Sequence, residues 1–305
     1  MSGSASVRDM PVGPLIRPMR PADVSDVERL TGAAYHQLDV TTRPINRPEP
    51  TGRDERTAAR WRARCLRSIE HDPGGCWVAE VDSGLAGVAI SAKRELMWIL
   101  SGFAVAPAAQ GSGLGGRLLD AALAYGSGCL RGMLASSIDP RAVRRYRLAG
   151  FTLYPTMLLW GPVDRALLPV VDYVRQGTPA DRDLADSVDR LTRGAAHGPD
   201  HESLAGLSDL LVVDQPTGQG YAYVRPGGSV ELLAATNMRT AQRLLWECLA
   251  RTVPGQPVEL GHVSAEQEWA VDVAMAARLE VHQRGYLALR HMRPPAPYLP
   301  SGYHL

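Results

Sequence analysis

This sequence of 305 residues lacks long apolar runs and contains only four cysteines. No apolar stretch approaches the ~18 residues that a membrane span requires, and the start, Met-Ser-Gly-Ser-Ala-Ser, lacks the apolar core of a secretory signal. The cysteines have neither Cys-x-x-Cys nor zinc-type spacing, which argues against disulfide frameworks and metal sites; they are Cys65, Cys76, Cys129 and Cys248. We therefore expect a cytoplasmic protein with free, buried thiols, no metal and no membrane partner.

A strong charge of either sign is also missing, because 33 basic residues nearly balance 32 acidic ones. The net charge of +1 indicates no broad basic surface, so nucleic acid is not an expected partner. The arginines are nevertheless concentrated in residues 43–67, where an apolar helical face is formed by Ala58, Trp61, Cys65 and Ile69. These arginines cover either a solvated helix face or the edge of a substrate-binding slot, where they would hold an acidic substrate or the phosphates of a nucleotide.

Glycine is abundant at one junction, residues 103–119, where an expected strand meets an expected helix. Glycine lets the backbone approach an anion closely, and the first turn of a helix offers unpaired N–H groups. The junction therefore predicts a phosphate-binding site, formed around Gly111, Gly113, Gly115 and Gly116.

Two common phosphate loops fit this junction poorly. A Walker loop needs lysine and then serine or threonine after its last glycine, whereas Arg117 follows here. The glycine spacing itself is compatible with a dinucleotide loop, but that site also needs an acidic residue at the end of the next strand. The next expected strand, at 130–137, contains no acidic residue before Asp139.

The loop also reads Gln110-x-x-Gly113-x-Gly115, which resembles the pyrophosphate loop of the GNAT acyltransferase superfamily. Downstream, residues 139–151 resemble the family's Asn-x-x-Ala-x-x-x-Tyr-x-x-x-Gly-Phe helix, with aspartate in place of asparagine. The two patterns occur in the family's order and separation. The resemblance implies an N-acetyltransferase that uses acetyl-CoA as its co-substrate.

The resemblance also implies roles for individual residues. It places Phe103, Ala104 and Val105 along the pantetheine arm, with the Val105 N–H as donor to the oxyanion. The second pattern adds Asp139 and Ala142 to the coenzyme site. The pyrophosphate would be wrapped by Gln110, Gly111, Ser112, Gly113, Leu114, Gly115, Gly116 and Arg117.

Tyr146, in the second pattern, fits the general acid for the departing thiolate, because a phenol lies close to a thiol in pKa. The alternative is a tyrosine whose ring packs in the core. The general base is harder to identify, since the expected strand at 96–105 contains no carboxylate. Glu95, Asp39 and His36 remain the candidates for the general base.

Two segments of the second half contain further reactive groups. The Pro-rich tail at 293–305 is expected to be stiff and extended, and it either brings the terminal carboxylate into the active site or packs along the surface. Residues 197–202, His-Gly-Pro-Asp-His-Glu, have metal-capable side chains, but their Gly-Pro pair favours a loop. Either His201 or Glu202 remains a candidate to reach the binding site of the acceptor substrate.

The first half alternates between strands and helices. Beside the arginine-rich helix, we expect helices at 21–35, 113–125 and 140–148. Strands are expected at 15–19, 77–81, 85–92, 97–105, 130–137 and 151–160.

The second half repeats the first in eroded form, as Arg-x-x-x-Pro-Ala-Asp of residues 17–23 recurs at 175–181. The glycine loop has no counterpart there, because residues 229–254 contain no glycine. We therefore expect an α/β fold with two tandem GNAT-like domains and one coenzyme site. Each domain would have a mixed, mostly antiparallel sheet flanked by helices, at 12–163 and 164–292.

The expected function is direct transfer of an acetyl group from the thioester to an amine, within a ternary complex. A small-molecule acceptor is favoured, because paired domains suit an enclosed slot. The alternative is a catalytically inactive acyl-CoA-binding or interaction protein. A homodimer also remains open.

Overall fold

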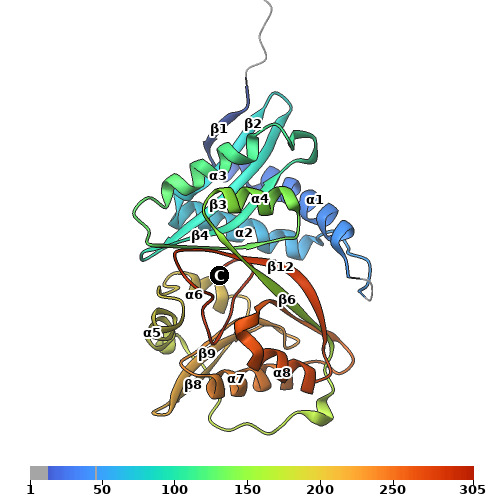
Figure 1. Ribbon diagram of the computed structural model, residues 1–305, viewed down its shortest axis with the longest axis vertical. Coiled ribbons are helices and arrows are strands. Elements are labelled where there is room, and N and C mark those ends of the chain that lie inside the picture. Colours follow the sequence, from blue (N-terminus) through green and yellow to red (C-terminus); the bar gives the residue numbers. More distant parts are fainter. Residues whose placement is uncertain (1–12, 45–46) are drawn as a thin grey trace, which may run out of the picture.

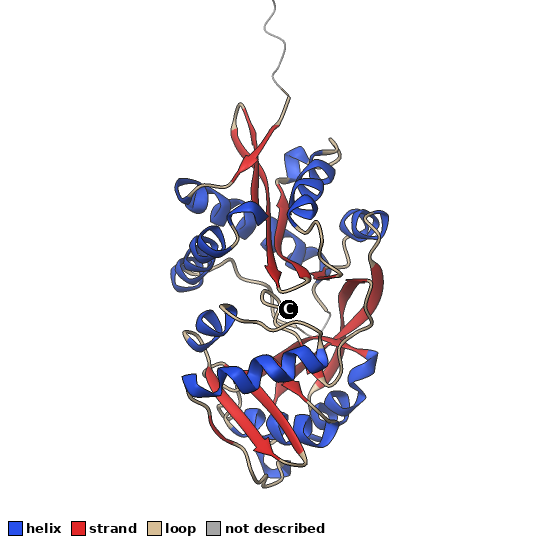
Figure 2. Cartoon of the chain, turned by 90° about the vertical axis from the view of Figure 1, so that its left-hand side faces the viewer, coloured by secondary structure: helices blue, strands red, loops and turns tan. Residues whose placement is uncertain are grey.

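The computed structural model describes residues 13–44 and 47–305. Two β-sheets form the centre of the molecule, one in each half of Figure 1, and helices cover their faces. The same two parts are seen from the side in Figure 2. The predicted domain start at residue 12 and the first residues of the chain lie outside the described part.

The larger sheet has eight strands in the order β1-β2-β3-β4-β5-β12-β6-β11. Its neighbouring strands are antiparallel except for β4 and β5, which are parallel. The first six strands in the chain are β1 (Leu15–Pro18), β2 (Cys76–Val81), β3 (Gly84–Arg94), β4 (Met97–Val105), β5 (Arg131–Ser136) and β6 (Thr152–Pro162).

Helices cover both faces of this sheet. On one face, α1 (Val24–Thr42) and α2 (Glu55–His71) pack their apolar sides on β3 and β4, with Val27 and Trp61 buried between them. On the other face lie α3 (Leu114–Tyr125) and α4 (Pro140–Leu148), which bury Leu118 against the sheet. The face predicted for the arginine-rich helix is confirmed, because α2 buries Ala58, Trp61 and Cys65, and Ile69 packs partly buried against the same core.

One strand of the larger sheet comes from near the end of the chain. β12 (Glu280–Arg290) lies between β5 and β6, where Tyr286 is opposite Ser136 on one side and Pro155 on the other. β11 (Pro257–Ser264) then pairs with the outer side of β6. The long strands β6 and β12 join the two parts of the molecule in Figure 1. The sheet therefore crosses the boundary that was predicted at 163/164.

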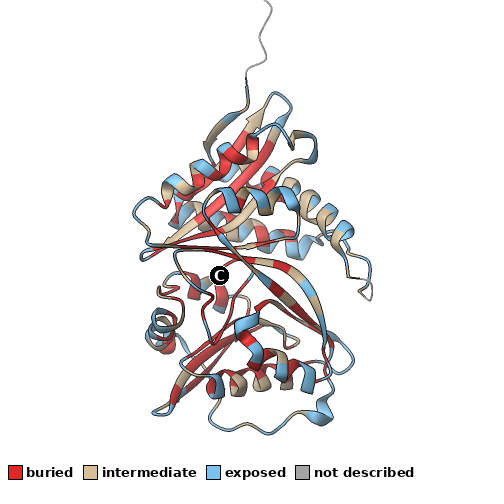
Figure 3. Ribbon diagram, viewed as in Figure 1, coloured by how far each residue is buried: buried red, intermediate tan, exposed pale blue. Residues whose placement is uncertain are grey.

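The smaller sheet has five strands in the order β13-β10-β9-β8-β7, and all of its pairings are antiparallel. One face packs against α7 (Met238–Ala250) and α8 (Glu268–Ala276), and the other against α5 (Arg182–Thr192) and α6 (Asp200–Ala205). Figure 3 shows the buried strands and the exposed outer sides of the helices. The strands are β7 (Arg175–Gln176), β8 (Asp209–Gln215), β9 (Gly218–Val224), β10 (Val230–Ala235) and β13 (Tyr298–Leu299).

The prediction of an α/β fold with mixed sheets flanked by helices is confirmed, and α4 matches its predicted range. Three details differ. α1 continues to Thr42, because no proline interrupts the chain before Pro44. The smaller sheet is antiparallel rather than mixed. The loop predicted at 197–202 is wrong in its second part, because α6 begins at Asp200, whose acidic side chain favours a first helical turn.

No helix in the described ranges combines the length and the apolar character needed to cross a membrane.

Candidate functional site

The larger sheet opens between β4 and β5. These strands pair only where Met97–Leu100 faces Arg131–Leu134, whereas β4 continues to Val105 along β3 alone. At the point of divergence the register of β3 and β4 shifts, so that Ser101 forms a bulge. The result is a gap in the sheet beside Phe103, Ala104 and Val105, the residues that the family resemblance places along the pantetheine arm.

The backbone of β4 presents polar groups to this gap. The Tyr35 hydroxyl lies 3.3 Å from the Phe103 nitrogen and 3.4 Å from its carbonyl oxygen. The Gln110 side-chain amide donates to the Val105 carbonyl at 3.1 Å. The backbone N–H and C=O groups of Phe103 and Val105 therefore point away from β3. No acceptor for the Val105 N–H is found in the described ranges. Tyr35 had no signal in the sequence, because only the path of α1 brings it here.

The glycine junction forms a loop with free amide groups. Gly111 and Gly113 have φ values of +82° and +81°, a left-handed conformation that favours glycine. Within the described part of the chain, the N–H groups of residues 111–115 have no hydrogen-bond acceptor. A Cβ at either left-handed glycine would meet no atom within 4 Å. The loop therefore offers open space and unpaired donors at the start of α3, the arrangement that binds phosphate.

Arginines of α4 surround this loop, a feature that sequence reasoning missed. A Cβ on Gly116 would collide with the Arg145 guanidinium, so the glycine admits that cation to the helix start. Arg141 contacts the Gln110 side-chain oxygen and pairs with Asp139 at 2.9 Å. Asp139 also caps α4 by accepting from the Arg141 amide, and the hydrogen bond from the Arg141 guanidinium keeps the pKa of this carboxyl low. The density of arginine in residues 141–147 was the available signal.

A cavity of about 590 Å³ lies beside the gap. Of the predicted site residues, it brings together Phe103, Ala104, Gln110, Asp139, Ala142 and Tyr146. Val105 and residues 111–117 lie outside its lining. The second half of the chain closes the cavity, with contributions from Arg225, Glu231, His262, Gln283, Arg284, Gly302 and Tyr303.

Tyr146 lies in the cavity wall with its ring edge-on to Phe103, at 6.1 Å between ring centroids. The side chain is 5% exposed, and its hydroxyl has no protein partner in the described ranges. Burial raises the pKa of Tyr146 above its usual value, so the phenol keeps its proton at neutral pH. The hydroxyl is therefore a proton donor that has no hydrogen-bond acceptor in the described ranges.

The three candidates for the general base differ in whether they line the cavity. Asp39 lines the cavity, and burial raises the pKa of its carboxyl. Glu95 lies in the β3–β4 turn, where it accepts from Arg190 at 2.8 Å, and it is outside the cavity lining. His36 also lies outside the lining. Of the three, the structure brings only Asp39 to the site.

His262 is a fourth candidate that the sequence did not indicate. It lies in a bulge of β11, between the pairs that Leu260 and Val263 make with β6, and has a left-handed φ of +57°. Its ring lines the cavity, and neither ring nitrogen has a hydrogen-bond partner in the described part of the molecule. Nδ1 is buried, so Nε2, which lies beside Gly302, is the nitrogen that a substrate in the cavity can reach. Burial and the nearby Arg284 lower the pKa of His262 to about 4. A neutral ring nitrogen is therefore available to accept a proton.

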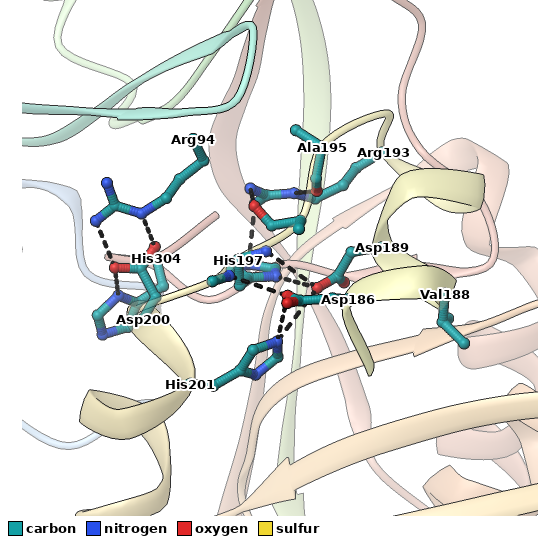
Figure 4. Close-up of polar contacts among 12 residues, drawn as sticks. Arg94, Asp186, Val188, Asp189, Arg193, Ala195, His197, Asp200, His201 and His304 are labelled. Atoms are coloured by element: carbon teal, nitrogen blue, oxygen red, sulfur yellow. Dashed lines mark hydrogen bonds and ion pairs between the residues drawn. The ribbon is translucent and has the colours of Figure 1, made fainter. Parts of the chain in front are cut away.

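The Pro-rich tail does not pack along the surface, so that alternative is wrong. Its last residue, Leu305, is fully buried, and its backbone oxygen accepts from Arg193. His304 lies 3.6 Å from Asp200, which also forms an ion pair with Arg94 at 2.6 Å (Figure 4). The tail reaches the cavity through Gly302 and Tyr303, whereas His304 and Leu305 are not part of its lining.

The histidines of segment 197–202 lie in a buried polar network, shown in Figure 4. Ligand-type atoms of Asp189, His197 and His201 lie within 4.8 Å of one another. The guanidinium of Arg193 can only donate, and it lies 2.9 Å from Nε2 of His197; the other ring nitrogen is 2.7 Å from Asp189. His201 contacts Asp186 at 3.1 Å and is fully buried, away from the cavity. These side chains form a hydrogen-bonded support for the tail.

Comparison with known proteins relates this site to one family. Residues 35–151 match the model of the Acetyltransferase (GNAT) family. No protein of curated function matches the chain in sequence.

Several solved structures share the fold over most of this chain. A candidate acetyltransferase of Pyrococcus horikoshii has a TM-score of 0.73 at 16% identity, covering 96% of this chain and 95% of its own. A GCN5-related N-acetyltransferase of Sphaerobacter thermophilus has a TM-score of 0.57 at 16% identity, covering 92% and 96%. Another from Kribbella flavida has a TM-score of 0.56 at 14% identity, covering 90% and 70%.

Proposed function

Because residues 35–151 belong to the GNAT acetyltransferase family, we propose that this acyltransferase moves an acetyl group from acetyl-CoA to an amine in a ternary complex. The observation that supports this most is the junction of β4 and α3. There, unpaired N–H groups of residues 111–115 adjoin a gap in the sheet and a cavity that contains the Tyr146 hydroxyl.

The coenzyme would bind along this junction. Its pyrophosphate fits the loop from Gln110 to Gly115 and the helix start at Gly116 and Arg117, where the helix dipole favours negative charge. Arg145 adds a cation at the same place. Asp139 and Ala142 border the cavity from α4, and Phe103, Ala104 and Val105 follow the gap.

The reaction needs an oxyanion donor, a base and an acid. The acceptor nitrogen attacks the thioester carbon and forms the C–N bond, while the carbonyl oxygen becomes an oxyanion that the Val105 N–H stabilises. The nitrogen loses its proton to His262. When the C–S bond breaks, the departing thiolate takes the proton of Tyr146. Asp39 contributes a negative charge that attracts the amine into the cavity.

The second half of the chain would serve as a wall of the acceptor site. Its elements from β7 to β12 follow the order of those from β1 to β6, which supports the proposal of two tandem GNAT-like domains. The counterpart of α3 is α7. Its N-cap residue Asn237 accepts a hydrogen bond from the Thr240 amide at 3.0 Å, so this N–H at the helix start is already paired. We therefore propose one coenzyme site per chain, and a small molecule as the acceptor.

The proposal is tested by measuring thiol release from acetyl-CoA across a panel of amines, with the acetylated product identified by mass. We expect turnover with at least one amine. Tyr146→Phe should lower kcat by about 10²–10⁴-fold, the usual loss for a positioned acid. Tyr154→Phe is the control, because this tyrosine lies in β6 outside the cavity lining. Coenzyme binding without thiol release would favour the inactive alternative.

A further inference from the structure

Arg64 differs from the other arginines that line the cavity. Four of those arginines each form an ion pair: Arg53 with Glu28, Arg141 with Asp139, Arg225 with Glu231 and Arg284 with Glu259. Arg64 has no carboxylate partner in the described ranges, and its Nε is buried without a hydrogen bond. A guanidinium whose donors lack protein acceptors is suited to a ligand acceptor.

The position of Arg64 is fixed from two sides. It belongs to α2, and its guanidinium lies over the Tyr303 ring, 4.3 Å from the centroid. That ring is held in turn by a 2.8 Å hydrogen bond between its hydroxyl and the Ser68 hydroxyl. Stacking on an aromatic ring orients a guanidinium and leaves its edge free for hydrogen bonds. The cation is therefore held in place before a ligand binds.

The same cavity contains a carboxylate without an ion pair. Asp39 lines the wall, and no basic side chain lies within ion-pair distance of it in the described ranges. The cavity thus offers an unpaired anion and an unpaired cation, besides the reacting groups. Such a pair of charges complements a ligand that has an amine at one end and an anionic group at the other.

We infer that Arg64 forms a subsite for a carboxylate on the acceptor, so that the substrates are amino acids or other amines that also contain a carboxylate. A planar guanidinium matches a carboxylate through two parallel hydrogen bonds. The coenzyme has its own anion site at the start of α3, whereas Arg64 is on α2, on the opposite face of the sheet. The inference rests on the proposed function, since it concerns the acceptor of that reaction.

The experiment compares acceptors that differ only in this group. L-phenylalanine, β-alanine and p-aminobenzoate are each paired with the corresponding carboxamide, and binding is measured by calorimetry in saturating coenzyme A. For at least one pair, wild type should bind the carboxylate roughly 10- to 100-fold more tightly than the carboxamide. Arg64→Gln should bring this ratio near one, and Arg64→Lys should retain part of it.

Arg60→Gln is the matched control, because it removes an arginine from the exposed face of the same helix. It should leave the ratio unchanged. A wild-type ratio near one for every pair, or a ratio that Arg64→Gln preserves, would overturn the inference. Weaker coenzyme binding in Arg64→Gln would assign the arginine to the coenzyme instead. Preferential carboxylate binding without thiol release would contradict the proposed function alone.

Discussion

His262 shows how a bulge can place a reactive group where no motif marks it. A left-handed backbone is uncommon for residues other than glycine, although asparagine, aspartate and histidine adopt it more often than the rest, and backbone strain of this kind clusters at functional sites. Here the bulge of β11 turns the ring into the cavity, beside Gly302 of the tail. The ring is neutral at pH 7 and has an unpaired nitrogen, so it can take the proton that the amine releases.

His262→Asn tests this role. Asparagine accepts the left-handed backbone, so the fold should persist while the proton acceptor is lost. We expect kcat to fall by about 10²-fold or more, with a steeper rise of rate with pH, because the amine must then lose its proton to solvent. His291→Asn is the control, since His291 is also left-handed but exposed. A pH–rate profile that matches wild type would remove His262 from the mechanism.

The sequence allowed part of the site to be predicted at this scale. The glycine loop, Tyr146 and Asp139 could be proposed from the sequence because their patterns are local and their spacing is fixed by one turn or one helix. Arg64 and Tyr35 were not singled out, because their role depends on what lies across the cavity. The same holds for the tail residue Tyr303, which contacts α2 from the far end of the chain.

At the scale of elements, the insertion of β12 is the main feature that the sequence did not predict. Alternating apolar residues indicate a strand and its buried face, but they do not specify which strand is its neighbour. The expected helices and strands of the first half were therefore placed well, whereas the joining of both halves through β5, β12 and β6 was not. The burial of the tail was missed for the same reason.

The tail is an element whose removal has a predictable cost. Deleting residues 303–305 leaves Arg193 buried without the Leu305 oxygen and removes His304 from Asp200. Buried charges that lose partners destabilise a protein strongly, so we expect a loss of about 2–4 kcal/mol in the free energy of unfolding. Urea denaturation measures this loss.

Ser68→Ala is the control for the deletion, since it removes only the contact with the Tyr303 hydroxyl. It should cost about 1 kcal/mol. A deletion variant as stable as wild type would show that the tail contacts contribute little.

At the scale of the whole molecule, stability should depend on pH through two buried histidines. Burial lowers the pKa of both His197 and His262 from 6.5 to about 4. As the pH falls from 6.5 to 4, the unfolded chain therefore binds protons that the folded protein does not, and stability is lost. Urea denaturation at pH 7, 6 and 5 should show this decline, and a constant free energy of unfolding over this range would contradict it.

Below pH 4, the pH dependence of stability comes from the buried carboxylates instead of the histidines. Burial alone would raise the pKa of Asp200, but hydrogen bonds from His304 and Arg94 hold it well below its usual value. Its contribution is present above the ordinary pKa of an aspartate, and it is lost as the pH falls further. The network of Figure 4 thus links the tail, α6 and the larger sheet most firmly near neutral pH.

The account depends on one coenzyme site per chain, at the junction of β4 and α3, and calorimetric titration with coenzyme A tests this directly. We predict one site in wild type and at least tenfold weaker binding in Gly113→Asp, whose carboxylate would repel the pyrophosphate. Gly84→Asp is the matched control, because this glycine also has a positive φ and open space around it, but it is the first residue of β3, next to the β2–β3 turn. Absence of binding, two sites per chain, or undiminished affinity in Gly113→Asp would contradict the account.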